Sequence, residues 1–370
     1  MRRRGRSGGK LKRRVHNFSA GPGALPLEVL QAAAADFITH GDEGMSIMEM
    51  SHRSDFWVEH QRGIEANLRA LAGISDDYYV LFLQGGATTQ FATVPLNLLS
   101  VGGSADYILT GVWSVKAMRE AQKLGYDVRA SASSEGSGFD RIPADTTANP
   151  GAVYVHYTSN NTIYGTGWKR PPDCGHGYLV CDASSDIFSR PMDVAAHGLI
   201  YAGAQKNLGP AGVTLVIVRK DLVGAAPADV PTMLDYAIQA AKDSAHNTPP
   251  VWSIYMLGLS VQWILDQGGL EAMARHNERK ARLLYDVIDA GDFYKGHALA
   301  ESRSLMNITF NLATPDLEAR FLEEAGGLDM LNLRGHRSVG GCRASIYNAV
   351  PLESVQALRD FMVDFSRRHG

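Results

Sequence analysis

The chain has 370 residues, enough for two domains, and its 45% hydrophobic content is typical of soluble globular proteins. No apolar run reaches membrane-spanning length, which excludes an integral membrane protein. The net charge of −3 hides an asymmetry: residues 1–14 hold eight of the 36 Lys and Arg and no acid, so the remainder has 28 basic against 39 acidic side chains. We expect this basic tail to be flexible. Its composition leaves open a nucleic-acid arm, a targeting segment or a dispensable extension.

Apolar periodicity predicts an alternation of helices and strands along the chain. In chain order it predicts helices over 27–39 and 56–71, a strand over 79–83 and a helix from the following glycines to about 99. Strands follow over 106–109, 152–156, 178–181, 199–202 and 213–218, then helices over 251–266 and 269–290. The last part combines strands near 305–311 and 342–346 with helices near 315–326 and 352–368. Continuous apolar strands separated by helices predict an α/β fold with a mostly parallel, doubly covered sheet and a smaller α+β domain.

Lys206 is the most informative residue, because it follows the apolar run 199–203 and precedes a turn-rich exit. A lysine in such a place can lose its proton when desolvated and attack a carbonyl. Upstream, Asp182 ends another apolar strand. A buried carboxylate for the ring nitrogen and a buried amine are the two protein groups that pyridoxal phosphate (PLP) chemistry needs. Most lysines are solvated surface residues, so the prediction depends on the neighbouring motifs.

Several polar segments follow other predicted strands. Gln84-Gly-Gly-Ala-Thr-Thr89 lies where a strand turns into a helix, a geometry that suits phosphate binding by helix amides. Trp113 can stack on a flat ring, and residues 158–162 offer hydroxyl and amide groups. Each feature alone has a commoner explanation, a tight turn or a core side chain. Because ligands bind beyond the carboxyl ends of parallel strands, we expect these segments to converge on one crevice.

A cationic set accompanies this crevice. It comprises two His-Arg pairs and a further arginine: His52, Arg53, His336, Arg337 and Arg343. Such side chains suit bidentate recognition of carboxylate and phosphate, although an isolated arginine is more often a surface ion pair. On a body that is net acidic, the grouping indicates a doubly anionic small-molecule substrate.

The motifs together resemble the phosphoserine aminotransferase family from about Val15 to the C-terminus. The resemblance is carried by Asn17-Phe-Ser-Ala-Gly-Pro, Glu49-Met-Ser-His-Arg-Ser, Phe82-Leu-Gln-Gly-Gly-Ala, Ala202-Gly-Ala-Gln-Lys-Asn, His246-Asn-Thr-Pro-Pro and Gly335-His-Arg-Ser-Val-Gly-Gly-Cys-Arg-Ala-Ser-Ile-Tyr-Asn-Ala349. It implies amino transfer between glutamate and 3-phosphohydroxypyruvate, giving phosphoserine and 2-oxoglutarate. Some family members also transaminate a phosphorylated hydroxythreonine in vitamin B6 synthesis, and no residue decides whether this chain does.

The resemblance also implies an architecture and residue roles. It implies a fold-type-I PLP-dependent transferase with a seven-stranded sheet in a large domain, 24–268, and a small domain made of 15–23 and 269–370. Lys206 would be the Schiff-base lysine, Asp182 would hold the pyridine nitrogen and Trp113 would stack on the ring. Ala87, Thr88, Thr162 and Gln205 would complete the cofactor site. Asn247 and Thr248 would reach the cofactor phosphate of the other subunit of a homodimer. His52, Arg53, His336, Arg337 and Arg343 would anchor substrate, with Arg343 on the α-carboxylate.

The chain departs from some relatives at Thr88, where they have an arginine; its absence removes one cation from the phosphate end of the substrate pocket. Two rival interpretations remain at this stage. One is another enzyme of the same fold, such as a cysteine desulfurase, which needs a mobile, exposed cysteine, or an alanine–glyoxylate aminotransferase. The other is a non-catalytic nucleic-acid-binding protein that uses the basic tail, which the intact Lys206 and Asp182 make unfavourable.

The three cysteines, Cys174, Cys181 and Cys342, show no metal-ligand spacing. We therefore expect no metal site. We interpret them as reduced thiols of a cytoplasmic protein.

Overall fold

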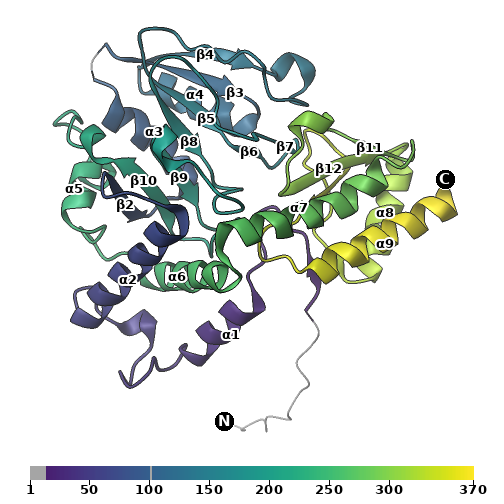
Figure 1. Cartoon of the computed structure of the whole chain (residues 1–370), viewed down its shortest axis with the longest axis horizontal. Coiled ribbons are helices and arrows are strands. Elements are labelled where there is room, and N and C mark those ends of the chain that lie inside the picture. The colour runs from purple at the N-terminus through teal and green to yellow at the C-terminus, as the bar shows by residue number, and fades with distance from the viewer. Residues whose placement is uncertain (1–13, 101) are drawn as a thin grey trace, which may run out of the picture.

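A seven-stranded sheet forms the centre of the larger part of the molecule (Figure 1). The computed structural model describes residues 14–100 and 102–370. The strand order is β2-β10-β9-β8-β5-β3-β4, made of β2 (Tyr78–Leu83), β3 (Ser104–Leu109), β4 (Asp127–Ser133), β5 (Ala152–Thr158), β8 (Tyr178–Asp182), β9 (His197–Gly203) and β10 (Thr214–Arg219). Only β10 runs antiparallel to its neighbours in this sheet. The predicted mostly parallel sheet is confirmed.

Helices cover both faces of this sheet. On β9, Leu199 and Tyr201 pack into one core while Ile200 and Ala202 pack into the other, as the two-residue period of a strand requires. The first core includes side chains of α3 (Gly86–Leu98) and α4 (Val112–Lys123). The second includes side chains of α2 (Asp55–Ala72) and α6 (Val251–Asp266), and α1 (Leu27–Ala35) packs on α6. Because both faces are dry, the strands show no polar alternation.

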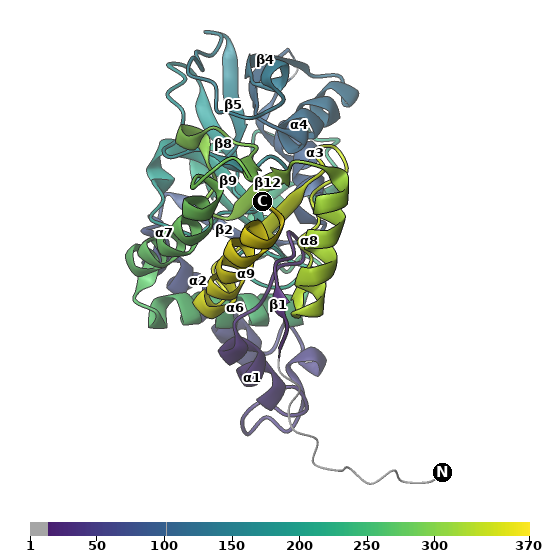
Figure 2. The same ribbon diagram turned by 90° about the vertical axis from the view of Figure 1, so that its right-hand side faces the viewer.

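The C-terminal part forms a separate core around a three-stranded antiparallel sheet. The strands are β11 (Tyr294–Gly296), β12 (Asn307–Leu312) and β14 (Cys342–Ser345), and the helices are α7 (Gly269–Ile288), α8 (Pro315–Gly327) and α9 (Leu352–His369). β1 (His16–Asn17) pairs with β13 (Met330–Leu331) and lies between α8 and α9 in Figure 2. Phe18 belongs to this core. The division of the chain into 24–268 and the two small-domain segments stays a prediction.

Some elements differ from those predicted. The helix predicted over 27–39 ends at Ala35: the amide of Asp36 closes the last turn on Ala32, and the side chain of Ile38 is 79% exposed. Pattern analysis missed α4, β4 and α5 (Tyr236–Ala241). β4 is an edge strand with mostly polar, exposed residues, so it lacks the apolar run that marked the other strands.

Two sequence predictions concern parts outside the sheets. The basic tail lies outside the described residues except for Arg14, whose Nη2 donates to the carbonyl of Leu25 at 3.2 Å. Among the described residues, no helix is both long and apolar enough to cross a membrane.

Candidate active site

The turn between β2 and α3 offers an anion-binding helix N-terminus. Gly85 and Gly86 adopt positive φ angles of 92° and 70°, which residues with a Cβ rarely adopt. The Thr89 hydroxyl donates back to the carbonyl of Gly85 at 2.8 Å and fixes the turn. The first-turn amides, including those of Ala87 and Thr88, have no intrahelical acceptor and suit a phosphate group.

Asp182 is a buried carboxylate at the end of β8. The backbone amide and the hydroxyl of Ser184 both donate to its Oδ1, at 3.0 and 2.6 Å. Burial raises the pKa of Asp182, while the positive charge of Lys206 and the bonds from Ser184 act in the opposite direction. Among the described residues, the hydrogen bonds to the Asp182 side chain reach only Oδ1. Its Oδ2 can therefore accept a hydrogen bond from a protonated ring nitrogen.

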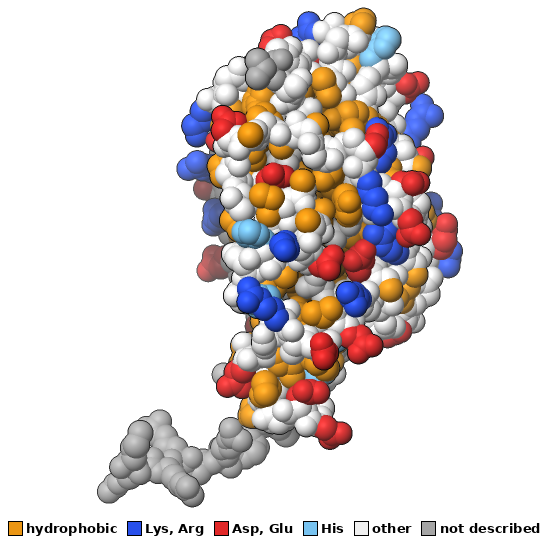
Figure 3. Space-filling model, turned by 90° about the vertical axis from the view of Figure 1, so that its left-hand side faces the viewer, with side chains coloured by type: hydrophobic (Ala, Val, Ile, Leu, Met, Phe, Trp, Pro, Cys, Tyr) orange, Lys and Arg blue, Asp and Glu red, His pale blue; other side chains and the backbone are white. Residues whose placement is uncertain are grey.

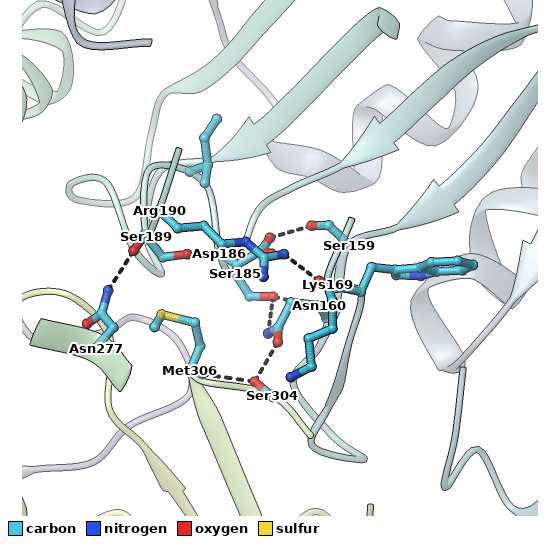
Figure 4. A network of polar contacts seen from close by, with 12 residues as sticks. Ser159, Asn160, Lys169, Ser185, Asp186, Ser189, Arg190, Asn277, Ser304 and Met306 are labelled. Atoms are coloured by element: carbon cyan, nitrogen blue, oxygen red, sulfur yellow. Dashed lines mark hydrogen bonds and ion pairs between the residues drawn. The ribbon is translucent and has the colours of Figure 1, made fainter. Parts of the chain in front are cut away.

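A second buried carboxylate lies behind Asp182. The Ser159 hydroxyl donates both to the backbone carbonyl of Asp182, at 3.2 Å, and to the side chain of Asp186 (Figure 4). Arg190 approaches Asp186 at 3.9 Å. This network fixes the end of β8 and thereby the direction of the Asp182 side chain.

Lys206 occupies the turn after β9 and is half-buried. Burial lowers its pKa, Asp182 raises it, and Arg343 lowers it again. The backbone of Gly21 lies against its aliphatic chain, and the amide of Gly23 donates to the carbonyl of Gln205 at 2.7 Å. A Cβ on Gly23 would overlap the Lys206 carbonyl oxygen. The segment before α1 can therefore approach the Lys206 turn this closely only because residue 23 is glycine. The result is an amine of reduced basicity held next to a carboxylate.

Trp113 links the lysine to the cationic side of the crevice. Its ring centroid lies 5.1 Å from the Lys206 Nζ. The indole Nε1 donates to the Thr162 hydroxyl at 3.1 Å, and the Thr162 carbonyl accepts from Arg343 Nη1 at 3.0 Å. Asp182, Lys206, Trp113, Thr162 and Arg343 therefore form one continuous group, as the sequence predicted.

Further cations surround Arg343. Burial lowers the pKa of Arg343, whose Nε is buried with no partner among the described residues. The pKa of His336 is lowered by burial first, and then by the charges of Arg343, Arg337 and Lys116. This pattern places four basic side chains close together and favours an incoming anion.

Comparisons with known proteins identify the family. The model of the aminotransferase class-V family matches residues 15–358. The chain belongs to this family. It is 54% identical over 362 residues to the phosphoserine aminotransferase of Lysinibacillus sphaericus, covering 97% of this chain and 100% of that protein. It is 52% identical over 361 residues to that of Desulfatibacillum aliphaticivorans, covering 97% of this chain and 100% of that protein.

Solved structures agree with this assignment. The phosphoserine aminotransferase from Bacillus circulans subsp. alkalophilus superimposes with a TM-score of 0.94 at 50% identity, over 96% of this chain and 99% of that chain. The PLP-bound phosphoserine aminotransferase from Trichomonas vaginalis gives a TM-score of 0.89 at 37% identity, over 95% of this chain and 100% of that chain. An alanine–glyoxylate aminotransferase from Nostoc, at 15% identity and a TM-score of 0.72, shares the fold alone.

The residues of this class-V aminotransferase fit PLP. Asp182 offers an acceptor for a ring nitrogen, Lys206 an amine and Trp113 a ring, and the α3 N-terminus at Ala87 and Thr88 offers amides for a phosphate. Gln205 is half-buried beside Lys206. The half-buried Arg343 adds a guanidinium whose Nε has no partner among the described residues.

Besides Ala87 and Thr88, four predicted site residues are not joined to Lys206 in this subunit by any contact among the described residues. His52 and Arg53 lie in the turn before α2, and Asn247 and Thr248 lie between α5 and α6. The Gln84 side chain donates to the Asn247 side chain at 3.2 Å and to the Thr248 carbonyl at 3.1 Å. Asn247 and Thr248 therefore lie beside the β2–α3 turn of their own subunit.

The sequence analysis missed one cation of the crevice, Lys116. Its Nζ lies 4.9 Å from the Trp113 ring centroid, and its charge lowers the pKa of His336. Its signal in the sequence is its position three residues after Trp113 on the same helix, where side chains share a face. The missed helix α4 concealed that spacing.

Proposed function

We propose that this chain is a phosphoserine aminotransferase, a PLP-dependent transaminase. It moves an amino group between L-glutamate and 3-phosphohydroxypyruvate, and yields 2-oxoglutarate and O-phospho-L-serine in serine biosynthesis. The observation that carries the proposal is the position of Lys206, between a buried carboxylate and a cluster of four basic side chains. Identity of more than 50% over nearly the whole chain to phosphoserine aminotransferases supports the substrate class.

Each residue of the crevice has a chemical task in this proposal. When bound, PLP supplies an electron sink that makes the Cα proton of the amino acid removable. The Oδ2 of Asp182 holds a proton on the ring nitrogen. The Nζ of Lys206, reduced in basicity by burial, would move the proton between the Cα of the amino acid and the C4′ carbon of the cofactor as general base and acid. Trp113 orients the ring plane, and the α3 amides with Gln205 hold the cofactor phosphate.

The cations divide between the two ends of the substrate. Arg343 binds the α-carboxylate, since the bond from its Nη1 to the Thr162 carbonyl holds the guanidinium next to the Thr162–Trp113 pair. His336 and Arg337 bind the distal phosphate or the glutamate side-chain carboxylate. The vitamin B6 precursor has the same phosphate and carboxylate ends, so these cations do not discriminate against it.

We further propose a homodimer in which the sites are shared. Phe37, Ile38, Met45 and Met48 are exposed between α1 and α2, on the part that projects at the bottom of Figures 1 and 2. Figure 3 shows hydrophobic side chains on this projection. A second subunit would cover them and bring His52, Arg53, Asn247 and Thr248 to the neighbouring site. We place the enzyme in the cytoplasm, supported by its three free, buried cysteines.

Other functions fit less well. Cys342 is fully buried in β14 and burial raises its pKa, whereas a desulfurase needs an exposed thiolate. Cys174 and Cys181 are also buried, with raised pKa values. A nucleic-acid-binding role would require residues outside the described part of the chain.

A visible spectrum tests the activity directly. Glutamate should bleach the absorbance of the PLP-loaded protein, and 3-phosphohydroxypyruvate should restore it. Bleaching by glutamate without recovery would contradict the substrate assignment, and the release of sulfide from cysteine would favour the desulfurase instead.

Hybrid dimers test the shared site. Lys206→Ala and Asn247→Asp subunits, each inactive alone, should regain about one quarter of wild-type activity after mixing, since half of the dimers then contain one intact site. No recovery in mixtures shown to contain hybrid dimers would mean that Asn247 serves its own subunit.

A further inference from the structure

Lys280 is a second buried lysine that the reaction does not use. It lies on α7 and is 0% exposed. Its Nζ, with three N–H groups, lies within hydrogen-bond distance of four backbone carbonyls: Tyr347 at 2.7 Å, Ile346 at 3.0 Å, Val350 at 3.3 Å and Asn348 at 3.5 Å. No ion pair to a carboxylate is recorded for it within the described chain. All four acceptors belong to the segment 346–350 that joins β14 to α9.

Packing alone does not explain a lysine at this position. Burial of an ammonium group without a countercharge costs several kcal/mol, and a methionine of similar length would fill the same space. The stabilisation that offsets this cost must therefore come from the backbone carbonyls that the Lys280 Nζ holds together. Four acceptors from five consecutive residues fix the backbone of the segment much as a bound cation would.

The segment 346–350 reaches the active site through Asn348. The Asn348 amide donates to the Asn207 side chain at 2.9 Å, and Asn207 is the neighbour of Lys206. The Asn348 side chain donates to the Phe188 carbonyl at 3.0 Å and accepts from Asn277 at 2.8 Å. Asn277, one turn before Lys280 on α7, also donates to the Ser189 carbonyl at 2.9 Å (Figure 4).

Two further contacts extend the same arrangement. The Tyr347 hydroxyl donates to the Ala20 carbonyl at 2.6 Å, and Ala20 precedes the glycine segment that closes on Lys206. Arg343 lies on β14, directly before the segment. The segment that Lys280 holds is thus connected to the Lys206 turn through Asn348, to the N-terminal glycine segment through Tyr347, and to Arg343 through β14.

We propose that Lys280 is a positioning residue of the active site: by gathering the carbonyls of 346–350, it holds Asn348 against Asn207 and so fixes the Lys206 turn relative to Arg343. This inference rests on the proposed role of Lys206 as the reacting amine. Lys280 touches neither substrate nor cofactor, and it acts through Asn348 and Tyr347.

Hydrogen exchange of the cofactor-free full-length protein tests the proposal without any activity. In Lys280→Met, the amides of 346–350 and of the Lys206 turn should exchange at least about tenfold faster than in wild type, while those of β5 and β8 stay unchanged. Lys295→Met, which removes an exposed lysine on β11, is the matched control and should leave both segments unchanged. Unchanged exchange in both segments, or equal acceleration over the whole protein, would overturn the proposal.

Kinetics provide the second readout. Lys280→Met should bind PLP stoichiometrically and lose at least about tenfold in kcat, because misplacement of a reacting group affects the chemical step. Lys280→Arg, which keeps a donor, should recover part of that loss. A kcat within twofold of wild type would overturn the proposal. Suppose that neither wild type nor any variant showed transaminase activity, while the amides of 346–350 and of the Lys206 turn still exchanged faster in Lys280→Met. The positioning role would then stand and the proposed reaction would be refuted.

Asn348→Ala decides the question if Lys280→Met does not fold. This variant keeps the four backbone carbonyls around the Lys280 Nζ and removes the hydrogen bonds of the Asn348 side chain to Phe188 and Asn277. Faster exchange confined to 346–350 and the Lys206 turn supports the coupling, and unchanged exchange in the Lys206 turn refutes it.

Discussion

Lys206 and Lys280 are both lysines whose pKa is lowered by burial, yet their surroundings differ. Lys206 is half-buried, beside the Asp182 carboxylate and the Trp113 ring. Lys280 is enclosed by neutral carbonyls, and burial lowers its pKa to about 7. A reacting amine needs access and a balancing charge, whereas an amine that organises backbone needs enclosure and convergent acceptors. Low basicity by itself therefore identifies neither role.

Replacement of Lys206 should have the largest effect. Lys206→Ala should lose about 10⁴-fold or more in kcat, because the proposed mechanism uses the Lys206 amine to take the Cα proton. Steady-state turnover of the purified, PLP-loaded variant measures this loss. Near-normal turnover would remove the distinction between the two lysines.

Arg343 should affect both substrates and the lysine itself. Arg343→Ala should reduce kcat/KM about 100- to 1,000-fold for glutamate and for phosphoserine, since each loses a charged partner for its α-carboxylate. It should also raise the pKa of Lys206, because the Arg343 charge lowers it in the wild type. The pH dependence of chemical modification of Lys206 in the cofactor-free protein measures this shift. An unchanged pKa would show that the Arg343 charge does not act on the Lys206 amine.

Arg337 should act on one substrate only. Arg337→Ala should reduce kcat/KM for phosphoserine about tenfold to a hundredfold and affect glutamate less, because the phosphate carries more charge than a carboxylate. The pKa of Lys206 should not move, since Arg337 is not among the groups that shift it. Equal losses for both substrates would contradict a phosphate role.

Lys280 should change the pH dependence of the stability of the protein. Its pKa is about 7 in the folded chain and 10.5 as the ordinary value, so between these limits the folded protein binds fewer protons than the unfolded one. The stability that the neutral, buried Lys280 contributes is fully present above its ordinary pKa of 10.5 and is lost as the pH falls towards 7. The free energy of unfolding of wild type relative to Lys280→Met should therefore rise by about 1.4 kcal/mol per pH unit between roughly pH 7 and 10.

Denaturant unfolding of the cofactor-free proteins measures that difference. Lys295→Met should show no such slope relative to wild type, because its lysine is exposed. A flat difference between wild type and Lys280→Met would mean that Lys280 keeps its ordinary basicity in the folded chain.

The parts of the site predicted best are those defined by local sequence. The turn of Gly85 and Gly86 and the positions of Asp182 and Lys206 each depend on a strand end and the residues next to it. The convergence of these segments followed from the rule for parallel sheets, and the structure brings Asp182, Lys206, Trp113, Thr162 and Arg343 together. The roles assigned to the individual site residues stay predictions until they are measured.

The parts that pattern analysis missed depend on distant residues. Lys280 stands in the polar run Glu278-Arg279-Lys280, which resembles a solvated helix face. Lys116 belongs to α4, a helix whose apolar pattern was too weak to be recognised. For His52, Arg53, Asn247 and Thr248, the sequence names the residues but not the subunit whose site they serve.

By itself, the sequence determined the class of the protein, its alternation of helices and strands, the doubly covered sheet and the candidate amine and carboxylate at two strand ends. These follow from short-range periods and from glycine turns, which the chain carries locally. The tertiary structure alone decided that Lys280 is buried among carbonyls, that Lys116 joins the cations around His336, and that segment 346–350 connects Arg343 to Lys206. Burial and desolvation depend on what packs against a side chain, and those neighbours come from parts of the chain far apart in sequence.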